Sequence, residues 1–158
     1  MGKIKTKEEI GKIADELREE GKKIVTCNGA FDLIHIGHIK FLQKAKAQGD
    51  VLIVGLNSDK SIKKYKSKDR PLIQQEFRAE TLEALECVDY ITIFDETVPM
   101  SFIENIKPAV HVNGYDYGKD CIEKPIVEKY GGKIHIPSNY KGISTTKLIE
   151  RIMKVYGK

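Results

Sequence analysis

The fold of this chain is decided by the stretch Asn28-Gly29-Ala30-Phe31-Asp32-Leu33-Ile34-His35-Ile36-Gly37-His38. It follows an apolar strand pattern at residues 23–27 and leads into a helix pattern, so it predicts a strand-to-helix turn. The N-terminus of such a helix favours anions, because its backbone N–H groups are free and its dipole end is positive. His35 and His38 add two side chains on one helix face, and Gly37 lets a phosphate approach the main chain. The stretch therefore predicts a triphosphate site.

The same histidine pair has two other interpretations. Imidazole is the commonest metal ligand, so His35 and His38 could bind zinc, or the pair could close one edge of the core. A zinc site is disfavoured because Cys27, Cys87 and Cys121 lie far apart, with no C-x-x-C spacing. A purely structural role is disfavoured because the glycines of the stretch make a loop rather than a packed surface. We therefore favour phosphate binding and expect no metal-ligating residues.

Length and composition indicate a single globular domain over residues 1–158, with residues 1–21 as an N-terminal helical extension. The net charge of +4, with 32% charged residues, suits anionic small molecules at least as well as nucleic acid. No apolar run is long enough for a signal sequence or a membrane span, and the three cysteines form no disulfide framework. We expect a cytoplasmic protein that binds neither nucleic acid nor membranes.

Helix and strand patterns alternate along the chain, separated by short turns rich in Gly, Asn, Asp and Pro. The first helix begins after a Thr6 cap, with Glu9 completing a capping box, and ends at Gly21. A later helix is expected to begin after a Thr97 cap, with Pro99 in its first turn. Further strands are expected at residues 51–56, 90–94, 109–112 and 133–136, and further helices at 39–49, 75–85, 97–106 and 147–155. The alternation predicts an α/β fold: a doubly wound, Rossmann-like parallel sheet of about five strands, with ligands at the carboxyl ends of the strands.

Two segments that follow predicted strands are expected to be active-site loops, the lysine-rich stretch 60–70 and the loop 114–118. Charge runs are most often solvated surface, and Tyr65 among the lysines would also suit base stacking on nucleic acid. The stretch 60–70 begins at a strand end beside the expected phosphate site. We therefore favour lysines that neutralise phosphates.

A second helix N-terminus is predicted at residues 142–146, which read Gly-Ile-Ser-Thr-Thr. Ser144 and Thr145 are ordinary helix-capping residues. Their hydroxyls, together with the free N–H groups of the helix, also suit a phosphate. Both roles can hold together, because the backbone N–H groups still point outward.

Taken in order, these motifs resemble the nucleotidyltransferase superfamily of the cytidylyltransferase type, and the resemblance covers almost the whole chain. It rests on G-x-F-D-x-x-H-x-G-H at residues 29–38, N-S-D at 57–59, K-x-K at 64–66, E-x-R ending at Arg78, and G-I-S-T-T at 142–146. Within the superfamily the chain is most similar to the heptose 1-phosphate adenylyltransferases. The residues that support this are Gly21 to Val25, Asn28-Gly29, Arg70-Pro71, Gly114 to Tyr117 and Gly131-Gly132, while Asn113 stands where those enzymes have lysine.

The resemblance implies roles for individual residues. The two histidines would bind the triphosphate and stabilise developing charge, and two lysines would hold the acceptor phosphate or the α-phosphate; these catalytic residues are His35, His38, Lys64 and Lys66. Arg78 would offer a planar fork to a phosphate. Asp32 or Asp59 would order loops or approach magnesium. The residues expected to bind the nucleotide are Gly29, Ala30, Phe31, Asp32, Gly37, Asn113, Gly114, Asp116, Ser144, Thr145 and Thr146.

The implied reaction is nucleotidyl transfer from ATP to heptose 1-phosphate, with release of pyrophosphate. A sugar phosphate supplies its own nucleophilic oxygen, because its second pKa is about 6, so no strong general base is required. Mg²⁺ would be held mainly by the triphosphate. The alternatives are a cytidylyltransferase acting on glycerol 3-phosphate or a similar alcohol phosphate, a flavin-adenylating enzyme, and a nucleotide-sensing module without turnover. The resemblance also implies a homodimer, and a separate sugar kinase upstream in the pathway.

Overall fold

A computed structural model describes residues 2–118 and 120–158 of the chain. Five parallel strands form one sheet in the order β3-β2-β1-β4-β5. Their bounds are β1 Ile24–Gly29, β2 Val51–Asn57, β3 Tyr90–Phe94, β4 Val110–Val112 and β5 Lys133–His135. The predicted Rossmann-like parallel sheet is confirmed. Since β1 has β2 on one side and β4 on the other, the strand order reverses at β1, which is where doubly wound folds bind ligands.

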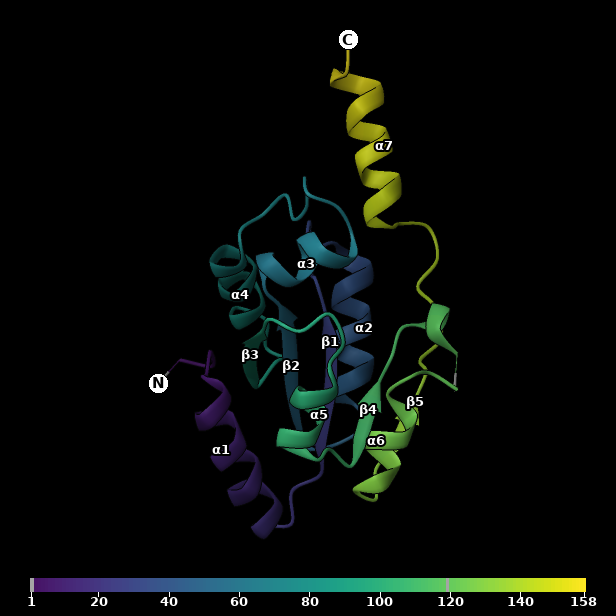
Figure 1. Ribbon diagram of the computed structural model, residues 1–158. Helices are drawn as coiled ribbons and strands as arrows, with labels where there is room; N and C mark the ends of the chain where they lie inside the picture. The colour runs from purple at the N-terminus through teal and green to yellow at the C-terminus, as the bar shows by residue number, and fades with distance from the viewer. Residues whose placement is uncertain (1, 119) are drawn as a thin grey trace.

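Helices cover both faces of the sheet (Figure 1). Their bounds are α1 Lys7–Glu19, α2 Ile36–Lys46, α3 Asp59–Tyr65, α4 Gln75–Glu83, α5 Met100–Ile106, the 3₁₀ turn Tyr115–Tyr117, α6 Lys124–Lys129 and α7 Thr145–Tyr156. On one face, Leu42 of α2 and Leu82 of α4 pack on strand residues such as Val25. On the other face, residues of α1, α5 and α6 pack on alternate strand residues such as Ile24 and Ile53. This alternation buries both faces of the sheet, as parallel sheets require.

Helix α1 belongs to the second of these cores. Its capping box is the predicted one, with Thr6 Oγ1 accepting from the Glu9 N–H at 3.2 Å and Glu9 Oε2 accepting from the Thr6 N–H at 2.7 Å. Ile10 and Ala14 are fully buried against the sheet. Helix α1 therefore packs against the sheet as part of the same core. That a single domain spans residues 1–158 stays a prediction.

Two predicted boundaries are wrong. The lysine-rich stretch 60–70 is not a loop throughout, because α3 occupies its first half. Ser58 caps this helix by accepting from the Ser61 N–H at 3.1 Å, and Ile62 anchors it in the core. Helix α5 begins at Met100 after Pro99 rather than after a Thr97 cap. The run of lysines concealed a helix that Ser58 caps and Ile62 anchors, and the expected Thr97 cap placed the start of α5 too early.

Candidate active site

A cavity of about 690 Å³ opens at the carboxyl ends of β1 and β4. Its walls come from the turn after β1, the start of α2, the segment 66–70, the turn 114–117 and the segment that leads into α7. Most of the predicted site residues line it, namely Gly29, Ala30, Phe31, Asp32, His35, Gly37, His38, Lys66, Gly114, Asp116, Ser144 and Thr145. Segments far apart in sequence therefore meet in one place.

The two histidines form one wall and are held by backbone N–H groups of their own turn. His35 is the N-cap of α2, and its Nδ1 accepts from the Gly37 N–H at 3.0 Å. His38 Nδ1 accepts from the His35 N–H at 3.2 Å, and the two ring centroids lie 4.0 Å apart. Because each Nδ1 accepts a backbone hydrogen bond, each neutral ring carries its proton on Nε2. Both rings can therefore donate from Nε2 to an anion.

Both histidines are biased towards the neutral form. Burial, with smaller contributions from the neighbouring His35 and Lys66, lowers the pKa of His38 to about 4, while Asp32 opposes the shift. Burial also lowers the pKa of His35. Near neutral pH the pair therefore acts through hydrogen bonds. A bound phosphate would favour the charged form and return the pKa values upward.

Gly37 is required by the histidine beside it. A Cβ atom at Gly37 would lie 2.8 Å from Cε1 and 2.9 Å from Nδ1 of His35. Real Cβ atoms do not approach a ring so closely, so only glycine lets the His35 ring lie over the start of α2. The sequence predicted a glycine that admits a phosphate to the main chain. The structure adds a different reason, which is space for an imidazole.

The turn after β1 is strained and is held by a buried carboxylate. Phe31 and Leu33 have φ angles of 47° and 49°, a region that non-glycine residues seldom adopt. Between them, Asp32 is 3% exposed and accepts from the backbone N–H groups of Leu72 at 2.8 Å and Ile73 at 3.0 Å. Both of its oxygens are therefore engaged. Asp32 orders a loop, one of the two roles foreseen for it.

Arg70 is a cavity residue that the sequence analysis did not assign. Its guanidinium pairs with Asp32, through Nε at 3.0 Å and through Nη2 at 2.9 Å. The side chain remains 22% exposed on the cavity wall beside Lys66. Burial, followed by the charge of Arg70, lowers the pKa of Lys66. Lys66 and Arg70 form a second, cationic wall, and Arg70 could have been suspected from its place at the end of the lysine-rich stretch.

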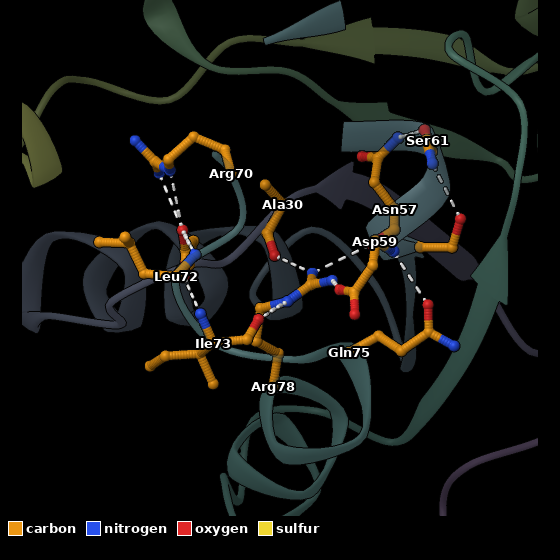
Figure 2. A network of polar contacts seen from close by, with 11 residues as sticks. Ala30, Asn57, Asp59, Ser61, Arg70, Leu72, Ile73, Gln75 and Arg78 are labelled. Carbon is orange, nitrogen blue, oxygen red and sulfur yellow. Dashed lines mark hydrogen bonds and ion pairs between the residues drawn. The ribbon is translucent and has the colours of Figure 1, made fainter. Parts of the chain in front are cut away.

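Arg78 does not line the cavity, which corrects the expected phosphate contact. Its side chain is 1% exposed, and four of its N–H groups are used within the protein. They donate to the carbonyl oxygens of Ile73, Ala30 and Asn57 and to Oδ1 of Asp59 (Figure 2). Arg78 thus ties together the turns after β1 and β2 and the segment before α4. Asp59 is its ion-pair partner and also orders a loop.

Three other predicted residues lie outside the cavity walls. Lys64 is exposed on α3, two residues before the cavity residue Lys66. Asn113 is buried and donates to Glu123 Oε2 at 3.1 Å. Thr146 is exposed on α7, one residue beyond the cavity residue Thr145. In each of these motifs, therefore, one residue lines the cavity while a nearby residue does not.

Additional side chains complete the cavity and make it basic. Besides Lys66 and Arg70, three lysines line it, Lys44, Lys141 and Lys147. Lys44 Nζ donates to the backbone oxygen and to Oγ of Ser138, both at 2.8 Å, and so fastens the segment before α7 to α2. Clustered cations in a concave site attract and concentrate anionic ligands. The sequence could not predict this cluster, because its lysines are scattered along the chain and come together only in the folded structure.

Within residues 2–118 and 120–158, no group of three His, Cys, Asp or Glu side chains is placed to hold a metal ion. The carboxylate that faces the cavity from an exposed position is Asp116. In the same described part of the chain, no helix is both long and apolar enough to cross a membrane.

Comparison with known families agrees with this geometry. A family model described as Cytidylyltransferase-like matches residues 26–151, which include the histidine wall, the cationic wall and the start of α7. The chain belongs to the cytidylyltransferase-like family. The predicted nucleotidyltransferase is thus confirmed at the level of the family. The match ends within α7 and leaves α1 outside it.

Curated relatives cover nearly the whole chain. It is 48% identical over 156 residues to the bifunctional protein HldE of Geobacter metallireducens, and 47% identical to that of Geobacter sulfurreducens. In both cases the match takes in 98% of this chain and 32% of the relative. The chain therefore spans about a third of the length of these relatives.

Two solved structures share the fold. The lipopolysaccharide core biosynthesis protein of Thermoplasma volcanium aligns with a TM-score of 0.67 and 29% identity, over 77% of this chain and 100% of that one. A pantoate-beta-alanine ligase from Francisella tularensis, complexed with beta-gamma ATP and beta-alanine, aligns with a TM-score of 0.67 over 100% of this chain and 79% of that one. At 18% identity, the second likeness concerns the fold alone.

Proposed function

We propose that this chain transfers the adenylyl group of ATP to heptose 1-phosphate and releases pyrophosphate. The observation that carries the proposal is the cavity itself, which is lined by two histidines with Nε2–H donors and by the cations Lys66 and Arg70. Family membership supports nucleotidyl transfer. The likeness to HldE proteins and to a lipopolysaccharide core biosynthesis protein supports the heptose substrate.

The reaction fits a site without a strong base. A phosphate oxygen of the sugar phosphate attacks the α-phosphorus of ATP, the bond from that phosphorus to the bridging oxygen breaks, and pyrophosphate leaves with the electron pair. The attacking oxygen is already largely ionised near neutral pH. The barrier lies in bringing two anions together and in stabilising charge on the leaving group. Fixed donors and cations reduce both costs.

The two walls suggest a division of labour. His35 and His38 would donate from Nε2 to the triphosphate and stabilise its developing negative charge. Lys66 and Arg70 would hold the acceptor phosphate against the α-phosphate, with Arg70 able to bind two oxygens at once. Lys64, which lies outside the wall, would act at longer range by its charge.

The remaining phosphates would lie at the start of α7. Ser144 and Thr145 line the cavity there, and the helix N-terminus adds free backbone N–H groups. Asp116 and Gly114 would face the base and ribose from the opposite turn. A triphosphate-bound Mg²⁺ would supply further charge neutralisation, and Asp116, the exposed carboxylate on the cavity wall, would contact its water shell.

The pathway context follows from the same chemistry. A separate sugar kinase would supply heptose 1-phosphate. Cys27, Cys87 and Cys121 are free thiols, which suits a cytoplasmic enzyme. A homodimer is also proposed, as the family resemblance implies.

The test is pyrophosphate release in the presence of Mg²⁺, with ATP, CTP and GTP each tried against heptose 1-phosphate and glycerol 3-phosphate. We expect release with ATP and heptose 1-phosphate. Activity with CTP and glycerol 3-phosphate instead would assign the chain to the cytidylyltransferases. Nucleotide binding without release from any pair would indicate a sensing module. A variant lacking His38 provides the background rate.

A further inference from the structure

A second cavity, of about 300 Å³, lies between α1, α5 and the carboxyl end of β3. Helices α1 and α5 cover the same face of the sheet (Figure 1). None of the described residues that line this cavity lines the first one, and the proposed reaction does not use it. Cavities that bind small molecules begin at about this size. The question is therefore which ligand its walls would accept.

The floor of the second cavity carries a buried hydroxyl group. Thr92 on β3 points towards α1 and α5, because its neighbours Ile91 and Ile93 pack in the core on the opposite face. Thr92 is 4% exposed and lines the cavity. Among the residues that the structure describes, its Oγ1 atom has no hydrogen-bond partner. An unpaired buried hydroxyl destabilises a fold, so this position indicates that a ligand supplies the partner.

The strands around Thr92 explain why the protein itself supplies no partner. Gly55 lies opposite Thr92 on β2 and has no side chain. The ring of Phe102 fills the space over Gly55, because a Cβ atom there would lie 3.0 Å from Phe102 Cε1. On the outer edge of β3, residues 3–5 pair with Ile91, and the chain then turns into α1. The hydroxyl is left facing the cavity.

The rim of the second cavity is acidic. Asp95 and Glu96 follow β3, are exposed and line the cavity. Ser101 Oγ donates to Glu96 Oε1 at 2.6 Å, and this hydrogen bond lowers the pKa of Glu96, so the carboxylate is ionised near neutral pH. The described lining residues thus set two carboxylates against one cation, Lys7. The rim attracts a positively charged ligand.

The cation that fits these walls is organic. An ammonium group carries three N–H donors, which the Thr92 hydroxyl and the two carboxylates can accept. Beside them, Ile10, Phe94 and Phe102 make part of the wall apolar, which suits a short carbon chain or ring. A metal ion fits less well, since no three His, Cys, Asp or Glu side chains in the described part of the chain are grouped to hold one.

The acidic segment is held in place before any ligand binds. The Ser58 N–H donates to the Phe94 carbonyl oxygen at 2.9 Å, and Ser61 Oγ donates to the Glu96 carbonyl oxygen at 2.7 Å. Across the cavity, Asn105 Nδ2 donates to a backbone oxygen of α1 at 2.8 Å and joins α5 to that helix. A ligand would therefore enter a preformed cavity and need not order a loop.

We propose that the second cavity binds a small organic ammonium ion. The ammonium group lies between the Thr92 hydroxyl and the carboxylates of Asp95 and Glu96, and its carbon skeleton lies against Ile10 and Phe102. The carboxylates supply charge complementarity, and the hydroxyl supplies a directed acceptor. None of these residues has a role in the proposed reaction, so binding can be measured without turnover.

NMR titration of the isotope-labelled full chain, without nucleotide, tests the proposal. The probe is benzylamine, and benzyl alcohol and benzoate are the neutral and the anionic control. We expect benzylamine to shift the amide signals of residues 92–96 and of α5, with a dissociation constant of about 1 mM or lower. Both controls should bind at least roughly 10-fold more weakly. No shift at about 10 mM benzylamine, or equal binding of benzoate, would overturn the proposal.

Thr92→Val distinguishes a ligand-binding hydroxyl from a structural one. Valine keeps the branched shape and removes the oxygen. The free variant should be at least as stable as the wild type in urea denaturation, and it should bind benzylamine roughly 10-fold more weakly. Thr81→Val on α4 is the matched control, because Thr81 Oγ1 donates to the Phe77 carbonyl oxygen outside the cavity. Lower stability of Thr92→Val with unchanged binding would show a structural hydroxyl and contradict the proposal.

Substitution of the carboxylates tests the charge of the rim. Asp95→Asn and Glu96→Gln should each weaken benzylamine binding by about 3-fold to 5-fold, as expected for exposed charges. Neither change removes a backbone oxygen, so the bond from Ser61 to residue 96 is kept. Glu128→Gln, on the exposed surface of α6, is the matched control. Binding as tight as that of the wild type in both rim variants would mean that the carboxylates hold no ammonium group, and the proposal would fail.

Discussion

The two walls of the cavity are held in place by different means. The histidine wall is local, because His35 and His38 are each held by a backbone N–H group from within residues 35–37. The cationic wall is held from a distance, because Arg70 is oriented by Asp32, 38 positions earlier in the sequence. Arg78, which is buried outside the cavity, holds the backbone beside each wall by donating to the carbonyl oxygens of Ala30 and Ile73. A substitution in the histidine wall should therefore lower the reaction rate, while a substitution at Arg78, behind the cationic wall, should lower the stability of the fold.

The largest effect on chemistry is expected for His38→Ala. It removes an Nε2–H donor aimed at the triphosphate, which should lower kcat by roughly 100-fold to 1,000-fold, as loss of a transition-state donor does in other enzymes. The protein should stay folded, since only one hydrogen bond at the start of α2 is lost. Steady-state pyrophosphate release measures the change, with His135→Ala, outside the cavity walls, as the control. Turnover close to that of the wild type would remove His38 from the proposed chemistry.

The largest effect on architecture is expected for Arg78→Met. The methionine fills part of the space but leaves three backbone carbonyls and the Asp59 carboxylate without their donor. Loss of one partner from a buried polar network should lower the free energy of unfolding by about 3 kcal/mol or more. Urea denaturation measures it, with Lys12→Met on the exposed face of α1 as the control. A stable Arg78→Met with a raised KM for the acceptor alone would instead favour the direct phosphate contact that the sequence suggested.

The contrast between the walls also explains what could be predicted from the sequence. Periodic patterns in the sequence predicted the strands and most of the helices. The histidine wall could be predicted because the residues of its motif contact one another within one turn. Arg70 and Arg78 look alike in the sequence, since each is an arginine near a motif. Which of them faces the cavity depends on Asp32 and on carbonyl oxygens from other turns. Such long-range contacts leave no periodic pattern, so the roles of the two arginines could not be distinguished before the fold was known.

Gly37→Ala tests whether the histidine wall depends on space as well as on donors. The new Cβ would displace the His35 ring, and a shift of this kind should lower kcat/KM by roughly 10-fold to 100-fold. A double-mutant cycle provides the control. If the glycine acts through His35, adding Gly37→Ala to His35→Ala should cost little more. Fully additive losses would instead support close approach of a phosphate to the main chain.

Lys66→Ala and Lys64→Ala compare two lysines of one motif. Lys66 lines the cavity and Lys64 does not, so Lys66→Ala should raise KM for the acceptor or lower kcat by roughly 10-fold, the value of one charge-assisted hydrogen bond. Lys64→Ala should change either constant by about 3-fold at most, as expected for an exposed charge. Equal effects of the two substitutions would return Lys64 to the site.

The smallest expected effect is a change in how stability depends on pH. Burial lowers the pKa of His38 to about 4 in the folded protein, against 6.5 as its ordinary value. Between these pH values the unfolded chain takes up a proton at His38 that the folded protein does not, so the free energy of unfolding falls as the pH falls. His38→Gln removes this contribution, and its urea-denaturation curve should lose less stability between pH 7 and about pH 4. Equal losses in both proteins would mean that folding does not lower the pKa of His38. The ring would then take up its proton near its ordinary value of 6.5, and the histidine wall would differ less in charge from the cationic wall.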